Sequence, residues 1–169
     1  SVDLNSYYLQ GGYFAENTSV KLIAFAGKEK TYHAWGYATK KEMEDFGRRY
    51  NPCGEMYTDA NGNKHFYDDQ TDNYLQKNYQ LLFNHTISTA WNLNVALHYT
   101  KGDGYYEEYK DGRSLIEYGL KPFTIDGTEI TKSDLVRQKK MDNKFGGGVF
   151  SLNYTGNRLT ASLGGGLNQ

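Results

Sequence analysis

The sequence is poor in cysteine, in proline and in long apolar runs, and each shortage excludes a class of protein. Its single cysteine, Cys53, can form neither an internal disulfide nor a Cys-x-x-Cys metal or redox motif. Two prolines in 169 residues, beside 15% aromatic residues, are the opposite of what disordered chains contain. The 19 basic and 20 acidic residues nearly cancel, so nucleic acid is not an expected partner. No run of about 18 apolar residues offers a membrane helix, and no signal peptide is recognisable at the start.

Tyrosine and glycine are abundant, with 16 and 19 residues, and this mixture favours β-structure with many turns. The clearest pattern covers residues 91–99, where every second residue is large and apolar: Trp91, Leu93, Val95, Leu97 and Tyr99. Such strict alternation predicts a strand. Residues 78–87 alternate in the same way, and three residues separate the two runs, so the sequence predicts that they pair as a hairpin.

Two further hairpins are predicted with less regular patterns. One joins residues 4–14 to residues 18–30, and the other joins residues near 136–154 to residues 159–167. We therefore expect an all-β fold, an antiparallel meander of about six long strands, with residues 1–169 forming a single segment of a β-barrel domain.

Long polar connections link these hairpins, over residues 31–73 and roughly 108–136. Thr39 and Glu42 form a capping box that predicts a short helix over 40–46, and Asn61-Gly62 predicts a small hairpin. Tight turns at one end and long loops at the other are typical of a transmembrane β-barrel with extracellular loops. A soluble β-sandwich alternates in the same way, but its strands are usually about 5–6 residues long.

The loop sequences resemble those of TonB-dependent receptors from Bacteroides-type bacteria. The resemblance rests on Arg48-Arg49-Tyr50-Asn51-Pro52-Cys53-Gly54, on Phe66-Tyr67-Asp68-Asp69-Gln70-Thr71-Asp72-Asn73-Tyr74 and on Leu97-His98-Tyr99-Thr100-Lys101-Gly102. Leu135-Val136-Arg137 through Phe145-Gly146-Gly147 resembles the strand that follows. The match runs along nearly the whole chain, in register with the predicted hairpins.

This resemblance implies an outer-membrane transport protein that binds a scarce nutrient, such as a siderophore, vitamin, haem or oligosaccharide, and works with the TonB complex. Such barrels have 22 strands around a plugged lumen. Because six strands cannot close that barrel, we expect an internal segment without plug domain or TonB box, inactive when isolated. In the whole barrel this segment is expected to contact outer-membrane lipid. When isolated, it would be an open sheet with two unpaired edges, and we expect it to self-associate. The rival interpretation is a self-contained soluble β-domain that binds glycan or protein through its Tyr-rich loops.

The candidate ligand-binding residues lie in the first long loop. Exposed aromatic residues beside polar groups suit sugars and flat rings, which singles out Tyr32, His33, Trp35 and Tyr37, while Arg48 and Arg49 suit an anion. The acidic residues Asp68, Asp69, Asp72, Glu107 and Glu108 are expected to be solvated rather than catalytic. No nucleophile–base pair is recognisable, and the four histidines lack metal-ligand spacing. We therefore expect no enzyme activity, no cofactor and no metal.

Overall fold

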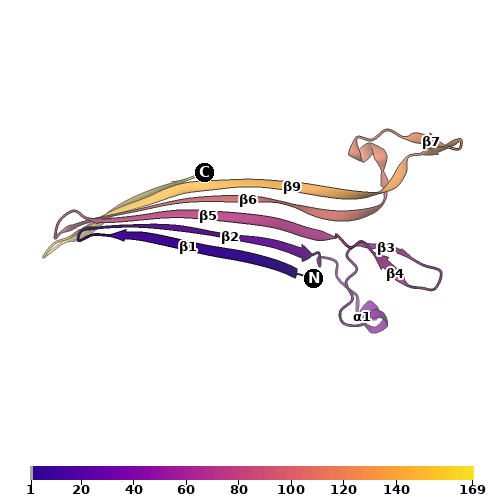
Figure 1. The fold of residues 1–169 in the computed structure, drawn as a ribbon, viewed down its shortest axis with the longest axis horizontal. Helices are drawn as coiled ribbons and strands as arrows, with labels where there is room; N and C mark the ends of the chain where they lie inside the picture. Colours follow the sequence, from indigo (N-terminus) through magenta and orange to yellow (C-terminus); the bar gives the residue numbers. More distant parts are fainter. Residues whose placement is uncertain (1) are drawn as a thin grey trace. The chain divides into compact units, whose positions relative to one another are not determined.

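The computed structural model describes residues 2–169, and its main element is one antiparallel sheet of six long strands (Figure 1). The strands are β1 (Val2–Phe14), β2 (Thr18–Tyr32), β5 (Thr71–Thr86), β6 (Trp91–Ser114), β9 (Lys132–Thr155) and β10 (Thr160–Asn168). They lie in the order β1-β2-β5-β6-β9-β10, so neighbours in the sheet are long strands that are also consecutive in the chain. The predicted all-β meander is confirmed.

Three short turns join the strands within the hairpins. The amide of Ala15 donates to the carbonyl of Thr18 at 2.8 Å, and that of Gly156 donates to Leu159 at 2.8 Å. In the central hairpin the amide of Ile87 donates to Trp91 at 2.9 Å. All three predicted hairpins are therefore confirmed, with turns at the expected places.

The connections between hairpins carry small elements of their own. Between β2 and β5 lie helix α1 (Lys40–Phe46) and the hairpin of β3 (Glu55–Thr58) with β4 (Lys64–Phe66). Between β6 and β9 lie the 3-10 turn η1 (Leu115–Tyr118) and the hairpin of β7 (Phe123–Ile125) with β8 (Thr128–Ile130).

The predicted helix and its capping box are confirmed. The amide of Glu42 donates to Oγ1 of Thr39 at 3.2 Å, while the Thr39 amide donates to Oε2 of Glu42 at 2.8 Å. These bonds also lower the pKa of the Glu42 carboxyl. Gly47 ends the helix at φ +88°, and Gly62 forms the predicted turn between β3 and β4 at φ +84°.

The expected extent of the second long loop, roughly 108–136, is wrong. Strand β6 continues to Ser114, and β9 already begins at Lys132. Polar pairs between the two strands, such as Tyr109 with Asp134 (2.6 Å), hold this stretch in strand conformation. Apolar alternation cannot reveal a strand that is stabilised by polar pairs.

The chain divides into two compact units. The strand unit comprises Leu4–Glu29, Tyr74–Gly104 and Met141–Gln169, and the loop unit consists mainly of Lys30–Asn73 and Tyr105–Lys140. The strand unit contains segments of the six long strands and the three turns. The two helical segments in residues 2–169 span seven and four residues, and neither could serve as a membrane-crossing helix.

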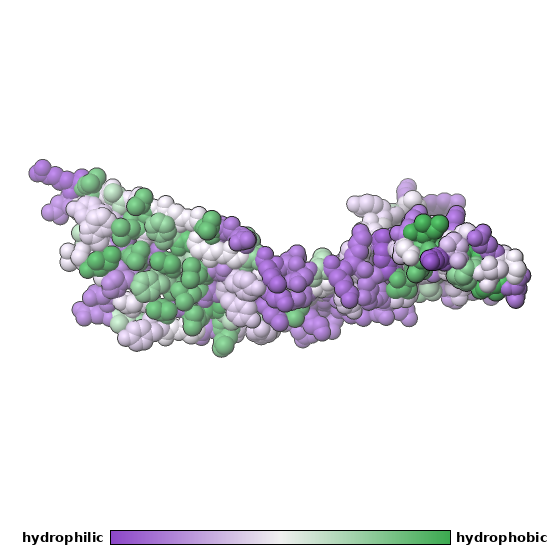
Figure 2. Space-filling model, turned by 90° about the horizontal axis from the view of Figure 1, so that it is seen from above, coloured by the Kyte–Doolittle hydropathy of each residue, from purple (hydrophilic) through white to green (hydrophobic). Residues whose placement is uncertain are grey.

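The sheet of the strand unit has one apolar face and one mixed face, because successive side chains of a strand point to opposite sides. We call the apolar face the set Tyr7, Leu9, Tyr13, Val20, Leu22, Ala24, Ala26, Tyr79, Leu81, Phe83, Trp91, Leu93, Val95, Leu97, Tyr99, Phe150, Leu152, Tyr154, Ala161, Leu163 and Leu167. A shallow groove on it is lined by Leu9, Leu22, Tyr79, Leu81, Leu97 and Tyr99. Figure 2 shows apolar residues gathered over the strands.

The opposite, mixed face carries hydrogen bonds that run from strand to strand, beside apolar residues such as Phe14, Leu82 and Val149. Thr100 donates to Oδ1 of Asn78 at 2.8 Å, and Nδ2 of Asn94 donates to the Ser151 hydroxyl at 3.2 Å. At the edge, the Ser162 hydroxyl donates to Oδ1 of Asn153 at 2.6 Å. The alternation predicted for residues 91–99 is therefore confirmed, because the asparagines of β6 lie on the side opposite its large apolar residues.

The apolar side chains of the strand unit are not packed into a core. Among residues 2–169, the buried apolar residues are Ala26, Cys53 and Leu115. On the apolar face, Leu9 is 69% exposed and Leu163 is 65% exposed. Exposed contiguous apolar surface of this kind marks a place where another apolar phase or partner binds.

Candidate functional site

Three aromatic rings from distant parts of the sequence meet in the loop unit. The chain leaves β2 after Tyr32, and the His33 amide then donates to the carbonyl of Gln70 at 2.8 Å. The side chain of Asn51 donates to the His33 carbonyl at 2.6 Å, so both polar backbone groups of His33 are held. The ring of His33 lies 3.8 Å from that of Trp35 and 5.9 Å from that of Tyr106, between centroids. We call His33, Trp35 and Tyr106 the ring cluster.

The His33 side chain is fully buried, yet neither ring nitrogen forms a hydrogen bond. Its Nε2 atom lies 3.5 Å from Oδ2 of Asp72, which is close for an ion pair but lacks hydrogen-bond geometry. A buried polar group without a partner costs about 1–3 kcal/mol. The ring cluster therefore holds an unused donor and acceptor beside a carboxylate.

A cation completes the cluster. The Nζ atom of Lys139 lies 5.5 Å from the centroid of the Tyr106 ring, in a cation–π position. Within residues 2–169, no carboxylate lies at ion-pair distance from Lys139, whose side chain is exposed. Trp35 is 52% exposed, and its ring meets that of Tyr106 at 81°. The arrangement combines flat aromatic surface with the Lys139 cation beside Tyr106 and the Asp72 carboxylate beside His33, which suits a flat, ring-bearing ligand.

The other sequence candidates do not join the ring cluster. The Tyr32 hydroxyl donates to the carbonyls of Cys53 (3.0 Å) and Tyr67 (2.9 Å), so it ties the loop together. Burial raises the pKa of this hydroxyl. Tyr37 is 95% exposed, and Arg48 and Arg49 follow helix α1 as exposed side chains.

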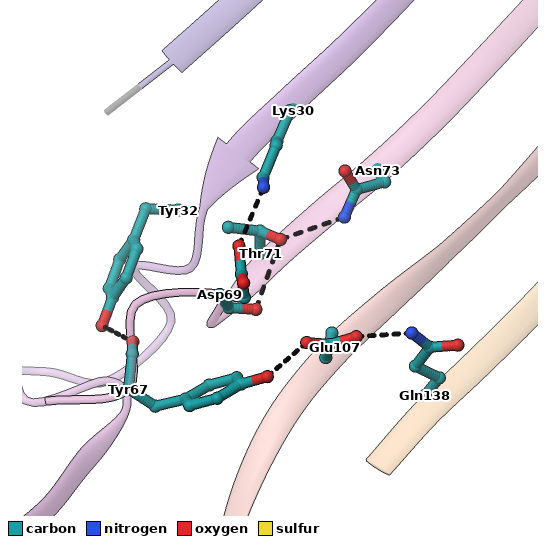
Figure 3. Close-up of polar contacts among 8 residues, drawn as sticks. All are labelled: Lys30, Tyr32, Tyr67, Asp69, Thr71, Asn73, Glu107 and Gln138. Carbon is teal, nitrogen blue, oxygen red and sulfur yellow. Dashed lines mark hydrogen bonds and ion pairs between the residues drawn. The ribbon is translucent and has the colours of Figure 1, made fainter. Parts of the chain in front are cut away.

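A polar network holds the base of the first long loop against the long strands (Figure 3). Lys30 forms an ion pair with Asp69 at 2.8 Å. The Tyr67 hydroxyl donates to one carboxylate oxygen of Glu107, and the Gln138 amide donates to the other. The network thereby joins strands β2, β6 and β9 through the residues that precede β5.

The hydrogen bond to Glu107 raises the pKa of Tyr67 to about 12, and that to Asp134 raises the pKa of Tyr109 to about 12. The neutral tyrosines therefore stabilise the fold below pH 10, and this contribution is lost as the pH rises from about 10 to about 12. We expect Tyr67 and Tyr109 to ionise last among the tyrosines, so that Tyr67→Phe and Tyr109→Phe each remove one late step from an absorbance titration. Loss of early steps instead would contradict the network.

The expectation that Glu108 is solvated is wrong. Glu108 is 3% exposed and bonds to Nε of Arg137 at 2.8 Å and to Nζ of Lys110 at 2.8 Å. Burial raises its pKa, but the hydrogen bonds and charges of the two cations outweigh burial and lower it overall. Successive strand residues face opposite ways, so Glu107 and Glu108 belong to separate polar groups.

The acids and histidines of residues 2–169 form no cluster of three or more that could hold a metal ion. Sequence reasoning identified His33 and Trp35 but missed Tyr106 and Lys139. The sequence feature that could have pointed to Tyr106 is strand alternation, which places Tyr106 on the same side of β6 as Thr100.

Comparison with known proteins leaves the chain without an assigned family. No protein-family model matches it, and no curated protein matches it either.

Proposed function

We propose that this chain forms six consecutive strands of a bacterial outer-membrane β-barrel of the TonB-dependent receptor type, whose surface loops bind a nutrient for import. The observation that carries the proposal is the apolar face. It extends over all six strands without a charged residue, while the opposite face is mixed, with hydrogen-bonded Asn, Ser and Thr side chains beside apolar residues such as Phe14, Leu82 and Val149. Transmembrane barrels have this division, with lipid on one side and the lumen on the other.

The dimensions and ends of the apolar face agree with this proposal. On β6 the face runs from Trp91 to Tyr99, nine residues, and a tilted strand needs about 9–11 residues to cross a bilayer. Trp91 and Tyr154 lie beside short turns with ring centroids 4.9 Å apart, and Tyr79 and Tyr99 lie at the other end. Aromatic girdles at both interfaces are typical of such barrels.

The histidine on the apolar side is His85, which has polar and aromatic partners. Its Nδ1 atom lies 2.8 Å from Oγ1 of Thr18, and its ring stacks on Phe83. A hydrogen-bonded histidine is less costly in an apolar environment than an unpaired one.

Cell fractionation tests the location. Antibody raised against this chain should detect, in native cells, an outer-membrane protein several times heavier than 19.3 kDa. A soluble band near 19.3 kDa would contradict the proposal and favour a soluble β-domain that binds glycan or protein.

The ring cluster is the proposed nutrient-binding surface, and Trp35 is its most exposed ring. Trp35→Ala should weaken binding of a ring-bearing ligand about fivefold, because a well-placed aromatic contact contributes about 1 kcal/mol. Ferric 2,3-dihydroxybenzoate, haemin and maltohexaose are suitable probes, and titration calorimetry of the full-length protein measures their binding. Tyr37→Ala is the matched control, since Tyr37 lies outside the cluster. Equal effects of both variants, or no binding of any probe, would contradict this placement.

A further inference from the structure

A row of lysines borders the apolar face at the end opposite the three turns. On each of four neighbouring strands, the apolar face ends at an apolar residue or a glycine, and the next residue on the same side is a lysine. The pairs are Ala26 and Lys28, Tyr79 and Lys77, Tyr99 and Lys101, and Gly146 and Lys144. Their strands β2, β5, β6 and β9 are consecutive in the sheet. All four lysines belong to the strand unit.

Contacts across the strands place three of these lysines side by side. Thr100 bonds to Asn78, which makes their neighbours Lys101 and Lys77 cross-strand partners. A Cβ added to Gly146 would lie 3.3 Å from the Tyr99 ring, so the next residues on that face, Lys144 and Lys101, are also neighbours. We call Lys77, Lys101 and Lys144 the lysine row.

Three like charges on directly opposed positions are unfavourable in a sheet. Within residues 2–169, the ion pairs relieve only one member, because Lys101 lies 3.1 Å from Asp103, while Lys77 and Lys144 have no carboxylate at that distance. Lys28, beside the row, likewise has none in the described chain. Asp103 and Asp142 act on Lys101, so the lysines of the row without an ion pair among residues 2–169 are Lys77 and Lys144.

The position of the row identifies the anion. If the apolar face lies in the acyl chains, as the proposed function requires, Tyr79 and Tyr99 lie at the interface. The lysines follow two residues later, roughly 7 Å along the strand, which is the depth of lipid headgroups. We propose that Lys77, Lys101 and Lys144, with Lys28 beside them, bind the phosphate of anionic lipid headgroups in the leaflet at the loop end of the barrel.

The test uses the full-length protein in neutral detergent, titrated with fluorescent phosphatidylglycerol and with fluorescent phosphatidylcholine. The variant Lys77→Gln/Lys101→Gln/Lys144→Gln should lose affinity for phosphatidylglycerol by at least about tenfold, since each lysine near an anionic surface contributes about fivefold. Binding of phosphatidylcholine should stay the same. Added salt should weaken the binding to the unaltered protein, because ions screen exposed charges.

The matched control replaces three exposed lysines of the loop unit, Lys41→Gln/Lys121→Gln/Lys132→Gln, with the same change of charge. It should retain the affinity of the unaltered protein. A second measurement guards against misfolding: without anionic lipid, the row variant should resist urea at least as well as the unaltered protein, because like-charge repulsion is removed. Equal loss in both triple variants, or equal affinity of the row variant and the unaltered protein, would overturn the inference. Recovery of the unaltered protein outside the membrane would overturn the proposed function as well, and the fractionation experiment detects that separately.

Discussion

Val95→Arg is expected to destabilise the assembled barrel by about 2–4 kcal/mol, the cost of an arginine near mid-membrane on a lipid-facing strand position. Val95 is the third of five apolar-face residues on β6, two residues from both Leu93 and Leu97, so it is far from either end of the face. The measurement is urea unfolding of the full-length protein in vesicles, together with the amount that reaches the outer membrane.

Asn94→Arg is the matched control, one residue away on the opposite, mixed face. It removes the hydrogen bond between Asn94 and Ser151, but its charge would face the lumen, where substitutions are tolerated better. We expect a clearly smaller loss than for Val95→Arg. Equal tolerance of the two arginines would show that the apolar face does not contact lipid.

Arg137→Met is expected to destabilise the protein by about 3 kcal/mol. It leaves the carboxylate of Glu108, which is 3% exposed, with Lys110 as its remaining cationic partner. Breaking a buried pair by removing one partner typically costs about 3–5 kcal/mol, and the low end applies because the Lys110 side chain is 25% exposed. Unfolding in urea, followed by the tyrosine signal, measures the loss.

The double variant Arg137→Met/Glu108→Leu provides the control for this pair. Since it removes the buried charge together with its partner, it should recover most of the stability lost in Arg137→Met. If the free energy of unfolding lost in the double variant equalled the sum of the losses in Arg137→Met and Glu108→Leu, the pair would not be coupled as the geometry indicates.

The strands were predicted correctly where apolar and polar residues alternate strictly. They were not predicted where polar pairs between strands stabilise them. Trp91 to Tyr99 alternate strictly, so their strand and its two faces were predictable. The continuation of β6 to Ser114 was not, because its stability depends on partners on β9, such as Asp134 for Tyr109. Local patterns carry no information about such distant partners.

The candidate site shows the same division. His33 and Trp35 are two residues apart, and their aromatic neighbourhood was visible in the sequence. Tyr106 and Lys139 join them through the alignment of β6 with β9, which depends on the exact offset between two long strands. A one-residue shift of β9 against β6 would turn Lys139 to the face opposite Tyr106. The burial of Glu108 was missed for the same reason.

A spin-label scan of β6 tests the central claim most directly. In a Cys53→Ser background, single cysteines at residues 92–99 of the full-length protein in vesicles would each carry a nitroxide label. We expect labels at 93, 95 and 97 to be relaxed mainly by dissolved oxygen, which concentrates in lipid, and labels at 92, 94 and 96 to show much weaker oxygen contact. If oxygen accessibility and nickel accessibility both alternate with a period of two residues, and one is high where the other is low, the result would support a lipid-facing apolar face. High accessibility to a water-soluble nickel reagent at 93, 95 and 97 would contradict it.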